Sequence, residues 1–213
     1  MAQKIMLDMD PGIDDAAAIA IALTDPQFTL VITGAFTNVA WLFRMYPEVK
    51  AKIDRLVVMG GSLTGGNMSS VAEFNIYTDP HAAKIVFEAG LPIVMIGLDV
   101  TMKALLSYDN IAKLSDVNES GAMLQALLQH YADNEATGKP MHDVNTLFYL
   151  AHPEAFTLTN YWVDVITEGP ALGATVADVL GSHHDTTNVA VATDIDVPAF
   201  NAWFMSEVAT FMK

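Results

Sequence analysis

The sequence predicts an α/β protein with an open, mostly parallel, Rossmann-like sheet that carries helices on both faces. Short apolar, β-branched segments alternate with segments of helical length along the 213 residues, which is typical of parallel sheets. Polar clusters follow several of the strand-like segments, at the ends where such sheets bind ligands. No internal repeat or shift in composition marks a linker, so we expect one domain over residues 1–213.

The first predicted elements follow from local residue types. Residues 4–8 form a short apolar strand that leads into an acidic turn with Pro and Gly. Residues 14–23 follow as a helix, because two acidic residues stand in its first turn, where the helix dipole favours them. The β-branched run at residues 29–33 predicts a strand, and residues 37–45 predict a helix that Pro47 ends.

A buried strand is expected at residues 56–59, where the apolar run stops at Gly60 and Gly61, and a loop rich in Gly, Ser and Asn covers residues 62–70. The remaining expected elements are a helix at 80–89, a strand at 92–96, helices at 120–131 and 143–150, strands at 162–167 and 188–192, and a helix at 198–211. Polar clusters then fall after Leu7, Thr33, Met59 and Ile96, at the carboxyl ends of predicted strands.

The charge balance excludes several classes of partner. The chain has 10 Lys and Arg against 25 Asp and Glu, a formal net charge of -15, so neither nucleic acid nor an anionic membrane is an expected partner. Hydrophobic residues make up 52% of the chain, but the longest apolar run, residues 16–23, is too short for a membrane span. The absence of cysteine excludes disulfides and a thiol nucleophile. The first residues show no targeting segment, so we expect a cytoplasmic protein.

The strongest local motif is the run Asp8-Met9-Asp10-Pro11-Gly12-Ile13-Asp14-Asp15. Four carboxylates so close together repel one another, and a bound cation is the simplest way to keep them all ionised. Oxygen ligands without cysteine indicate a hard metal, Ca²⁺ or Mg²⁺. The alternative is that Asp14 and Asp15 only cap the following helix, which accounts for two of the four carboxylates.

A second cluster, made of Asn67, Glu73 and Asn75, belongs to the glycine-rich segment that starts at Gly60. Its amides and carboxylate offer both donors and acceptors, which suits sugar hydroxyls. Phosphate is disfavoured, because residues 60–75 contain no Lys or Arg. The alternative is an ordinary flexible loop.

A third cluster is the pair His142-Asp143 at the start of a predicted helix. Taken alone, this pair is more simply explained by Asp143 capping that helix than by a functional site. The run His183-His184-Asp185 could ligate a metal, although solvated loop residues are the simpler interpretation.

Together and in this order, the clusters resemble the nucleoside hydrolase family, the inosine-uridine preferring nucleoside N-ribohydrolases. The resemblance covers the whole chain and is most specific in the first acidic run and in the segment around Glu73. The matching stretches are Asp8 to Asp15, Thr33-Gly34-Ala35-Phe36-Thr37-Asn38, Met59-Gly60-Gly61, Gly66-Asn67, Ala72-Glu73-Phe74-Asn75-Ile76-Tyr77-Thr78-Asp79-Pro80, Asp99-Val100-Thr101 and Met141-His142-Asp143.

The resemblance implies hydrolysis of the N-glycosidic bond of a ribonucleoside, as in nucleoside salvage, at a Ca²⁺ site. The implied metal ligands are Asp10, Asp15, the backbone carbonyl of Thr33, and Asp143. Asp10 is also the implied general base for the attacking water, whose pKa the ion lowers. Water attacks an oxocarbenium-like sugar directly, so no nucleophilic side chain is needed.

The resemblance also implies how substrate is held. Asp14 binds a ribose hydroxyl, and His142 lies beside the leaving base as a candidate catalytic proton donor. The implied substrate-binding residues are Asp14, Met59, Asn67, Glu73, Phe74, Asn75 and His142. The expected partners are a ribonucleoside and further copies of the chain, in a dimer or tetramer.

The chain departs from the family pattern at one point. Family members are longer by on the order of a hundred residues. The difference lies between Phe28 and Thr29, where similar chains place two further strands, their helices, a ribose-binding Asn and a loop with another active-site His. Without those strands we expect the first strand to form an apolar, uncovered sheet edge that oligomerisation or rearrangement buries. The alternative is that the chain is part of a longer protein.

Two other functions remain open from the sequence. One is a catalytically impaired, calcium-dependent nucleoside- or ribose-binding remnant of the family. The other takes Asp8-Met9-Asp10 as the aspartyl pair of a haloacid-dehalogenase-type phosphatase, although Pro11-Gly12 does not continue that motif and the Glu73 segment has no role in it.

Overall fold

The computed structural model describes residues 4–8, 28–131 and 135–211. The chain forms two compact units, each built from two segments. Unit 1 comprises Met1–Asp99 and Leu158–Thr193, and unit 2 comprises Val100–Thr157 and Asp194–Lys213. The single domain expected from the sequence stays a prediction.

The described elements alternate between strand and helix over much of the chain. In chain order they are β1 (Ile5–Asp8), β2 (Phe28–Ile32), α2 (Thr37–Met45), the 3₁₀ helix η1 (Pro47–Lys52), β3 (Ile53–Met59), α3 (Phe74–Thr78), α4 (Pro80–Phe87), β4 (Ile93–Ile96), α5 (Leu98–Thr101), β5 (Leu105–Ser107), α6 (Tyr108–Val117), α7 (Glu119–His130), β6 (Gly138–Pro140), α8 (Val144–Ala151), the 3₁₀ helix η2 (Pro153–Ala155), β7 (Phe156–Tyr161), β8 (Val163–Val165), β9 (Thr175–Ala177), β10 (Val189–Ile195) and α9 (Val197–Thr210).

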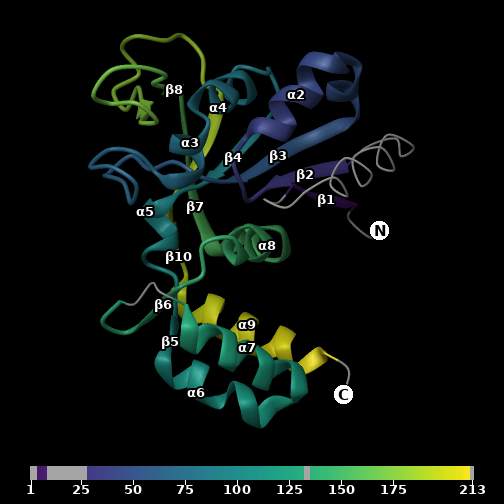
Figure 1. The fold of residues 1–213 in the computed structure, drawn as a ribbon. Helices are drawn as coiled ribbons and strands as arrows, with labels where there is room; N and C mark the ends of the chain where they lie inside the picture. The colour runs from purple at the N-terminus through teal and green to yellow at the C-terminus, as the bar shows by residue number, and fades with distance from the viewer. Residues whose placement is uncertain (1–3, 9–27, 132–134, 212–213) are drawn as a thin grey trace. The chain divides into compact units, whose positions relative to one another are not determined.

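The main sheet has six strands in the order β1-β2-β3-β4-β10-β7 (Figure 1). The β1–β2, β2–β3, β3–β4 and β4–β10 pairs are all parallel, which confirms the predicted α/β fold with a mostly parallel sheet. Two antiparallel pairs, β5 with β6 and β8 with β9, form separate two-stranded sheets. Because β2, β3 and β4 run in one direction, the residues that follow them meet at one edge of the sheet.

The core of unit 1 lies between one face of this sheet and the helices α2 and α4, which the ribbon shows on the same side (Figure 1). Leu30 and Ile32 of β2 point into this core, while Val31 points to the other face and is also buried. A strand that is buried on both faces reads as a continuous apolar run, which is why residues 29–33 are recognisable as a strand in the sequence. Phe36 and Phe87 close the core edge to face, with ring centroids 5.9 Å apart.

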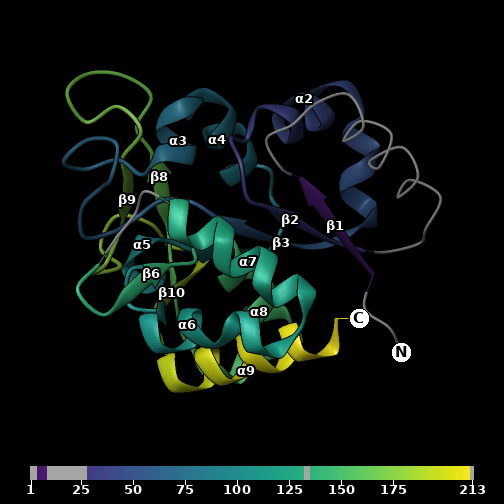
Figure 2. The same cartoon turned by 60° about the horizontal axis from the view of Figure 1, so that its bottom comes forward.

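Among the described strands, β1 forms one edge of the main sheet, next to β2 (Figure 2). Its register pairs Ile5 with Thr29 and Leu7 with Val31. Met6 is buried, whereas Ile5 and Leu7 remain 43% and 36% exposed. The expected apolar edge strand is therefore present. The segment that connects β1 to β2, on which the expected crossover depends, lies outside the described residues, as does the helix expected at 14–23.

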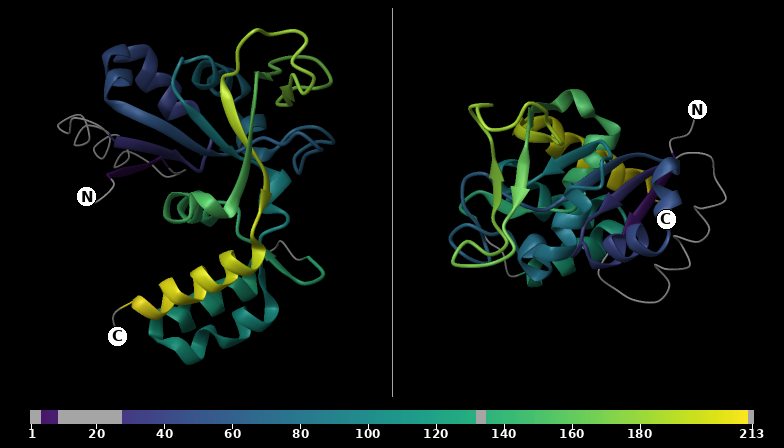
Figure 3. Two further views of the ribbon diagram at one scale, coloured as in Figure 1. Left: turned by 180° about the vertical axis from the view of Figure 1, so that it is seen from behind. Right: turned by 90° about the horizontal axis from the view of Figure 1, so that it is seen from above.

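Unit 2 is mainly helical. Its helices α6, α7 and α9 pack around a core of Leu106, Ile111, Leu114, Leu128, Phe204 and Val208, and α9 runs beside the other two helices (Figure 3). The ring of Phe148 in α8 lies 5.5 Å from that of Phe200 and 5.1 Å from that of Trp203, measured between centroids. No helix in the described part of the chain is both long and apolar enough to span a bilayer.

Most predicted elements have observed counterparts at similar positions. The sequence missed α3, α5, α6, β5, β6, β7 and β9, and it placed a strand over 162–167 where the structure has the shorter β8.

Candidate functional site

The structure brings part of the predicted sugar-binding cluster together at the carboxyl ends of β2 and β3. Thr33 directly follows β2, Met59 is the last residue of β3, and Glu73 and Asn75 lie at the start of α3. Asp10, Asp14 and Asp15 lie outside the described residues. His142 and Asp143 belong to unit 2 and are described separately.

Glu73 organises the backbone around itself. Its side chain is 2% exposed and caps α3, accepting hydrogen bonds from the backbone N–H groups of Asn75 and Ile76. Oε2 also accepts the N–H of Gly61 at 3.0 Å, which ties the turn after β3 to α3. Several backbone donors compensate for the burial of this carboxylate, because burial without partners is costly. The sequence identified Glu73 as a sugar ligand but not as a helix cap.

Asn75 joins the ends of two strands. Its Nδ2 atom donates to the carbonyl oxygen of Met59 at 3.0 Å and to that of Thr33 at 3.2 Å. The amide orientation follows from these two acceptors, because the opposite flip would turn Oδ1 toward two carbonyl oxygens. The predicted metal-ligand carbonyl of Thr33 and the predicted sugar-binding cluster are therefore neighbours, as the parallel strands require.

Asn67 reaches this cluster from the preceding loop. Its Oδ1 atom accepts the backbone N–H of Phe74 at 2.9 Å, next to Glu73 in the chain. Within the described part of the chain its Nδ2 makes no hydrogen bond, and the residue is exposed. Phe74 is also 49% exposed, so an amide donor and an aromatic face lie open beside the buried Glu73 and Asn75.

The loop that carries Asn67 depends on close backbone contacts. A Cβ atom at Gly66 would overlap the backbone of Ala72, so the chain approaches itself there as only glycine allows. The N–H of Met68 donates to the carbonyl of Ala72 at 3.1 Å. Gly61, at the start of the loop, has a φ of 76°, a conformation that favours glycine.

Two residues that the sequence did not assign fix the start of the same loop. Asp99 accepts the N–H of Leu63 at 2.9 Å and the hydroxyl of Thr64 at 2.7 Å. Thr175 accepts the N–H of Ser62 at 2.9 Å and donates to the carbonyl of Ser62 at 2.7 Å. Asp99 follows the predicted strand at 92–96, as the other polar clusters follow theirs, and that position is the signal that could have identified it.

In unit 2, His142 contacts a buried hydroxyl. Its Nδ1 atom lies 2.7 Å from Oγ1 of Thr101, the last residue of α5. Asp143 occupies the residue before α8, but its side chain makes no capping hydrogen bond and its backbone is helical, with φ -69° and ψ -36°. The capping interpretation of Asp143 is therefore wrong.

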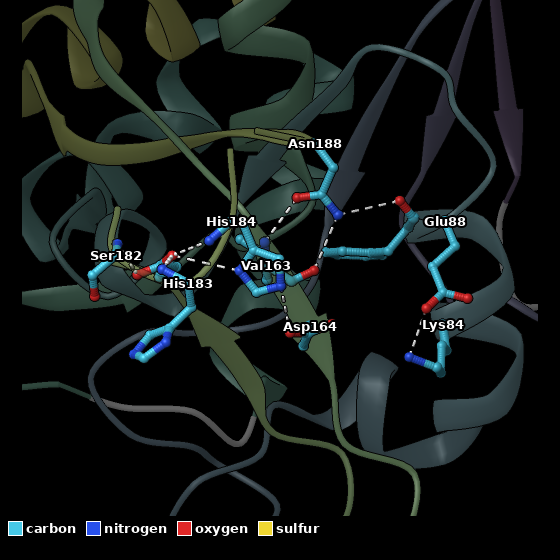
Figure 4. A network of polar contacts seen from close by, with 10 residues as sticks. Lys84, Glu88, Val163, Asp164, Ser182, His183, His184 and Asn188 are labelled. Carbon is cyan, nitrogen blue, oxygen red and sulfur yellow. Dashed lines mark hydrogen bonds and ion pairs between the residues drawn. The ribbon is translucent and has the colours of Figure 1, made fainter. Parts of the chain in front are cut away.

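The late histidines have structural partners. The ring of His184 stacks on that of Trp162, with centroids 4.6 Å apart and planes 9° apart. Its Nδ1 lies 3.4 Å from the carboxylate of Asp178. Its Nε2 lies 4.0 Å from that of Asp164, and Figure 4 shows these two residues side by side. Over the residues that the structure describes, no three His, Asp or Glu side chains are grouped closely enough to hold a metal ion.

Asp178 holds the loop that contains these histidines. Its carboxylate accepts the N–H groups of Ser182, His183 and His184 at 3.2, 2.8 and 3.0 Å. These bonds, that of His183 above all, lower the pKa of Asp178 below its ordinary value. The His183-His184-Asp185 run is thus part of a carboxylate-capped loop.

Comparison with known proteins gives the same family from sequence and from structure. Residues 24–202 match the family model of the inosine-uridine preferring nucleoside hydrolases. A non-specific ribonucleoside hydrolase RihC of Klebsiella pneumoniae subsp. pneumoniae is 47% identical over 183 residues, which are 85% of this chain and 60% of that protein. The RihC of Escherichia coli O1:K1 is 45% identical over the same length. The chain therefore spans about 60% of the curated relatives that it matches.

Solved structures of nucleoside hydrolases have the same fold as this chain. A purine-preferring ribonucleoside hydrolase from Gardnerella vaginalis superposes with a TM-score of 0.83 at 32% identity, covering 94% of this chain and 66% of that one. An inosine-uridine preferring nucleoside hydrolase from Bacillus anthracis superposes with a TM-score of 0.76 at 25% identity, covering 91% of this chain and 64% of that one.

Proposed function

The chain belongs to the inosine-uridine preferring nucleoside hydrolase family, and we propose that it hydrolyses the N-glycosidic bond of ribonucleosides to ribose and free base. The observation that carries the proposal is the pair of hydrogen bonds from Asn75 to the carbonyls of Thr33 and Met59. These bonds support the proposal because they join the residues proposed for sugar binding to the carbonyl proposed as a metal ligand. Because the chain belongs to this family, the phosphatase interpretation is wrong.

The proposed metal is calcium, held by Asp10, Asp15, the Thr33 carbonyl and Asp143. All four donors are oxygens, which is the ligand chemistry that Ca²⁺ prefers. The carbonyl of Thr33 fits such a role because the Asn75 amide fixes its position at the end of β2. When bound, calcium lowers the pKa of a coordinated water.

The proposed roles of the chain's own residues follow from their chemistry. Asp10 accepts a proton from the attacking water. Asp14, Asn67 and Asn75 hold the ribose, with Met59 and Phe74 lining the site. The charge of Glu73 lies close to the sugar, where a carboxylate stabilises the positive charge that develops on the ring in the transition state. His142 is the candidate proton donor beside the leaving base, where its N–H stabilises a group that would otherwise depart as an unstable anion.

The test is turnover of inosine and uridine by the full chain, before and after treatment with a chelator. We expect release of free base and ribose, loss of that release with chelator, and recovery with added Ca²⁺. Asp10→Asn should abolish turnover, whereas Asp109→Asn, an exposed change at the start of α6, should leave it intact. Base release that is unaffected by chelation would contradict the calcium role.

The second candidate is a calcium-dependent nucleoside- or ribose-binding remnant without turnover. The fact that favours it is the length, because the chain spans about 60% of its catalytic relatives. Ribose binding by calorimetry that needs Ca²⁺, together with no base release over long incubation, would identify this function instead of hydrolysis.

We also propose that the chain forms a homo-oligomer through the β1 edge. Ile5 and Leu7 are exposed on this edge strand, and exposed apolar edges pair readily with a second copy. Light scattering after chromatography should give a dimer or tetramer, and Leu7→Lys should shift it toward monomer. A monomeric wild-type chain would contradict this proposal.

A further inference from the structure

We propose that Thr101 is a positioning residue for His142, whose neutral ring it holds in the tautomer that carries hydrogen on Nε2. The two residues lie 41 positions apart in the sequence but in the same compact unit, with Oγ1 of Thr101 2.7 Å from Nδ1 of His142. This inference deepens the proposed function and rests on it, because His142 is the residue proposed as the donor beside the leaving base.

The direction of the hydrogen bond follows from the burial of Thr101. The side chain of Thr101 is 0% exposed, so its hydroxyl hydrogen cannot be given to bulk water. Over the described residues, Nδ1 of His142 is the one hydrogen-bond partner of that hydroxyl. A buried hydroxyl with a single partner donates to it, since otherwise its hydrogen is buried without an acceptor. Nδ1 of His142 therefore accepts, and it carries no hydrogen.

The tautomer of His142 is then determined. A neutral imidazole has one protonated and one unprotonated nitrogen, so acceptance at Nδ1 places the hydrogen on Nε2. Nε2–H is then the one N–H that the neutral ring can offer to the leaving base. It acts by hydrogen bonding to the negative charge that develops on the base, and the proton that completes the free base comes from solvent, because a neutral imidazole that gave up its own proton would become an imidazolate. Thr101 also restricts rotation of the ring, because turning the ring would leave the buried hydroxyl without its acceptor.

The matched variants are Thr101→Val and Thr101→Ser. Valine has nearly the shape of threonine but no hydroxyl, and serine keeps the hydroxyl. Thr29→Val is the control for folding, because Thr29 is a similarly buried threonine in β2 of the other unit and has no part in the site. His142→Gln identifies which of the six histidine signals belongs to His142.

The first measurement is independent of catalysis. Long-range ¹H–¹⁵N correlation spectra of the labelled chain at about pH 8.5, above the ordinary titration range of histidine, report the tautomer. Wild type, Thr101→Ser and Thr29→Val should show the Nε2–H tautomer for His142, and Thr101→Val should show a mixture. An Nδ1–H tautomer in wild type, or the Nε2–H tautomer kept in Thr101→Val, would overturn the inference even if the chain has no activity.

The second measurement separates positioning from a general loss of structure. On inosine, Thr101→Val should lower kcat by about 10- to 100-fold with little change in KM, and Thr101→Ser should restore it. On p-nitrophenyl riboside, whose leaving group departs as a stable anion, Thr101→Val should stay within about 2-fold of wild type. Equal losses on both substrates would show that Thr101 does not act through the N–H donor at the leaving base. Absence of inosine hydrolysis in wild type would instead contradict the proposed function.

Discussion

The side-chain amide of Asn75 lies 3.2 Å from the carbonyl oxygen of Thr33 and donates a hydrogen bond to it. This bond connects the end of β2 to α3 across 42 residues of sequence, and the same amide also reaches Met59 at the end of β3. A change at Asn75 therefore acts at once on the proposed sugar site and on the position of the proposed metal-ligand carbonyl.

Replacing Asn75 with Asp should damage both stability and turnover. The new carboxylate oxygen would face two carbonyl oxygens in a buried position, since Asn75 is 6% exposed. We expect the free energy of unfolding to fall by at least about 2 kcal/mol, as for other buried groups that lose their partner. Urea unfolding followed by circular dichroism measures the change.

Asn67→Asp is the matched control for Asn75→Asp. The Oδ1 atom of Asn67 is the acceptor for Phe74, and an aspartate keeps that acceptor at an exposed position. Its unfolding midpoint in urea should stay close to that of wild type. Equal losses in the two variants would contradict the assigned amide orientation of Asn75.

Glu73→Gln should destabilise the chain although the change is nearly isosteric. The glutamine NH₂ group would face backbone N–H groups that the carboxylate now accepts, including that of Gly61. Hydrogen bonds to charged groups typically contribute about 1.5–3 kcal/mol, so a loss in that range is expected. Thermal and urea unfolding of Glu73→Gln and of the exposed control Glu168→Gln give the comparison, and similar midpoints for both would refute the capping role.

Gly66→Ala should impair substrate binding more than overall stability. The added methyl group overlaps the backbone of Ala72, so the loop that carries Asn67 has to move. Gly90→Ala is the control, because a Cβ atom at Gly90 would meet nothing within 4 Å. The φ of 75° at Gly90 makes alanine unfavourable there by about 1 kcal/mol, so this variant loses some stability without a change near the site. We expect KM for inosine to rise about 10-fold in Gly66→Ala alone, and an unchanged KM would separate the loop from the site.

The carboxylate of Asp178 should contribute stability that depends on pH. Its folded-state pKa is lowered, chiefly by the His183 N–H, so its contribution is complete above the unfolded-state pKa of about 4 and is lost as pH falls through the folded value. Asp178→Asn should therefore melt below wild type at pH 7, and the difference should shrink at acid pH. Melting curves from about pH 7 to pH 2.5 test this, with the exposed Asp185→Asn as control. A constant difference across this range would show that the charge of Asp178 is not responsible.

The sequence predicted the fold best where burial leaves a continuous apolar pattern. All five residues of β2 are buried, so its sequence is a continuous apolar and β-branched run that predicts a strand. By contrast, β7 was missed because only the first of its six residues is buried, so it has no continuous apolar run. Helix α6 was missed because only Ile111 and Leu114 of its ten residues are buried, which leaves little helical periodicity to detect.

In the candidate site, residues that are close in the sequence could be predicted, and pairs that are far apart could not. Glu73, Asn67 and Asn75 stand close together in the sequence, so their cluster was visible before the structure. Asp99 acts on Leu63 and Thr64, about 35 residues away, and Thr101 acts on His142 across 41 residues. No local pattern carries such pairings, because they arise only when the chain folds back on itself. The roles of Asp10, Asp14, Asp15 and Asp143 stay predictions.

The strand order has a consequence for synthesis on the ribosome. β10 lies between β4 and β7 in the sheet, yet it is made after both of them. Among the described strands, a nascent β7 therefore has no neighbour in that sheet until β10 emerges. The helix α9, which follows β10 directly, completes the helical core of unit 2. Both units thus need the same stretch, Val189 to Thr210, so neither unit is complete before this stretch has been synthesised.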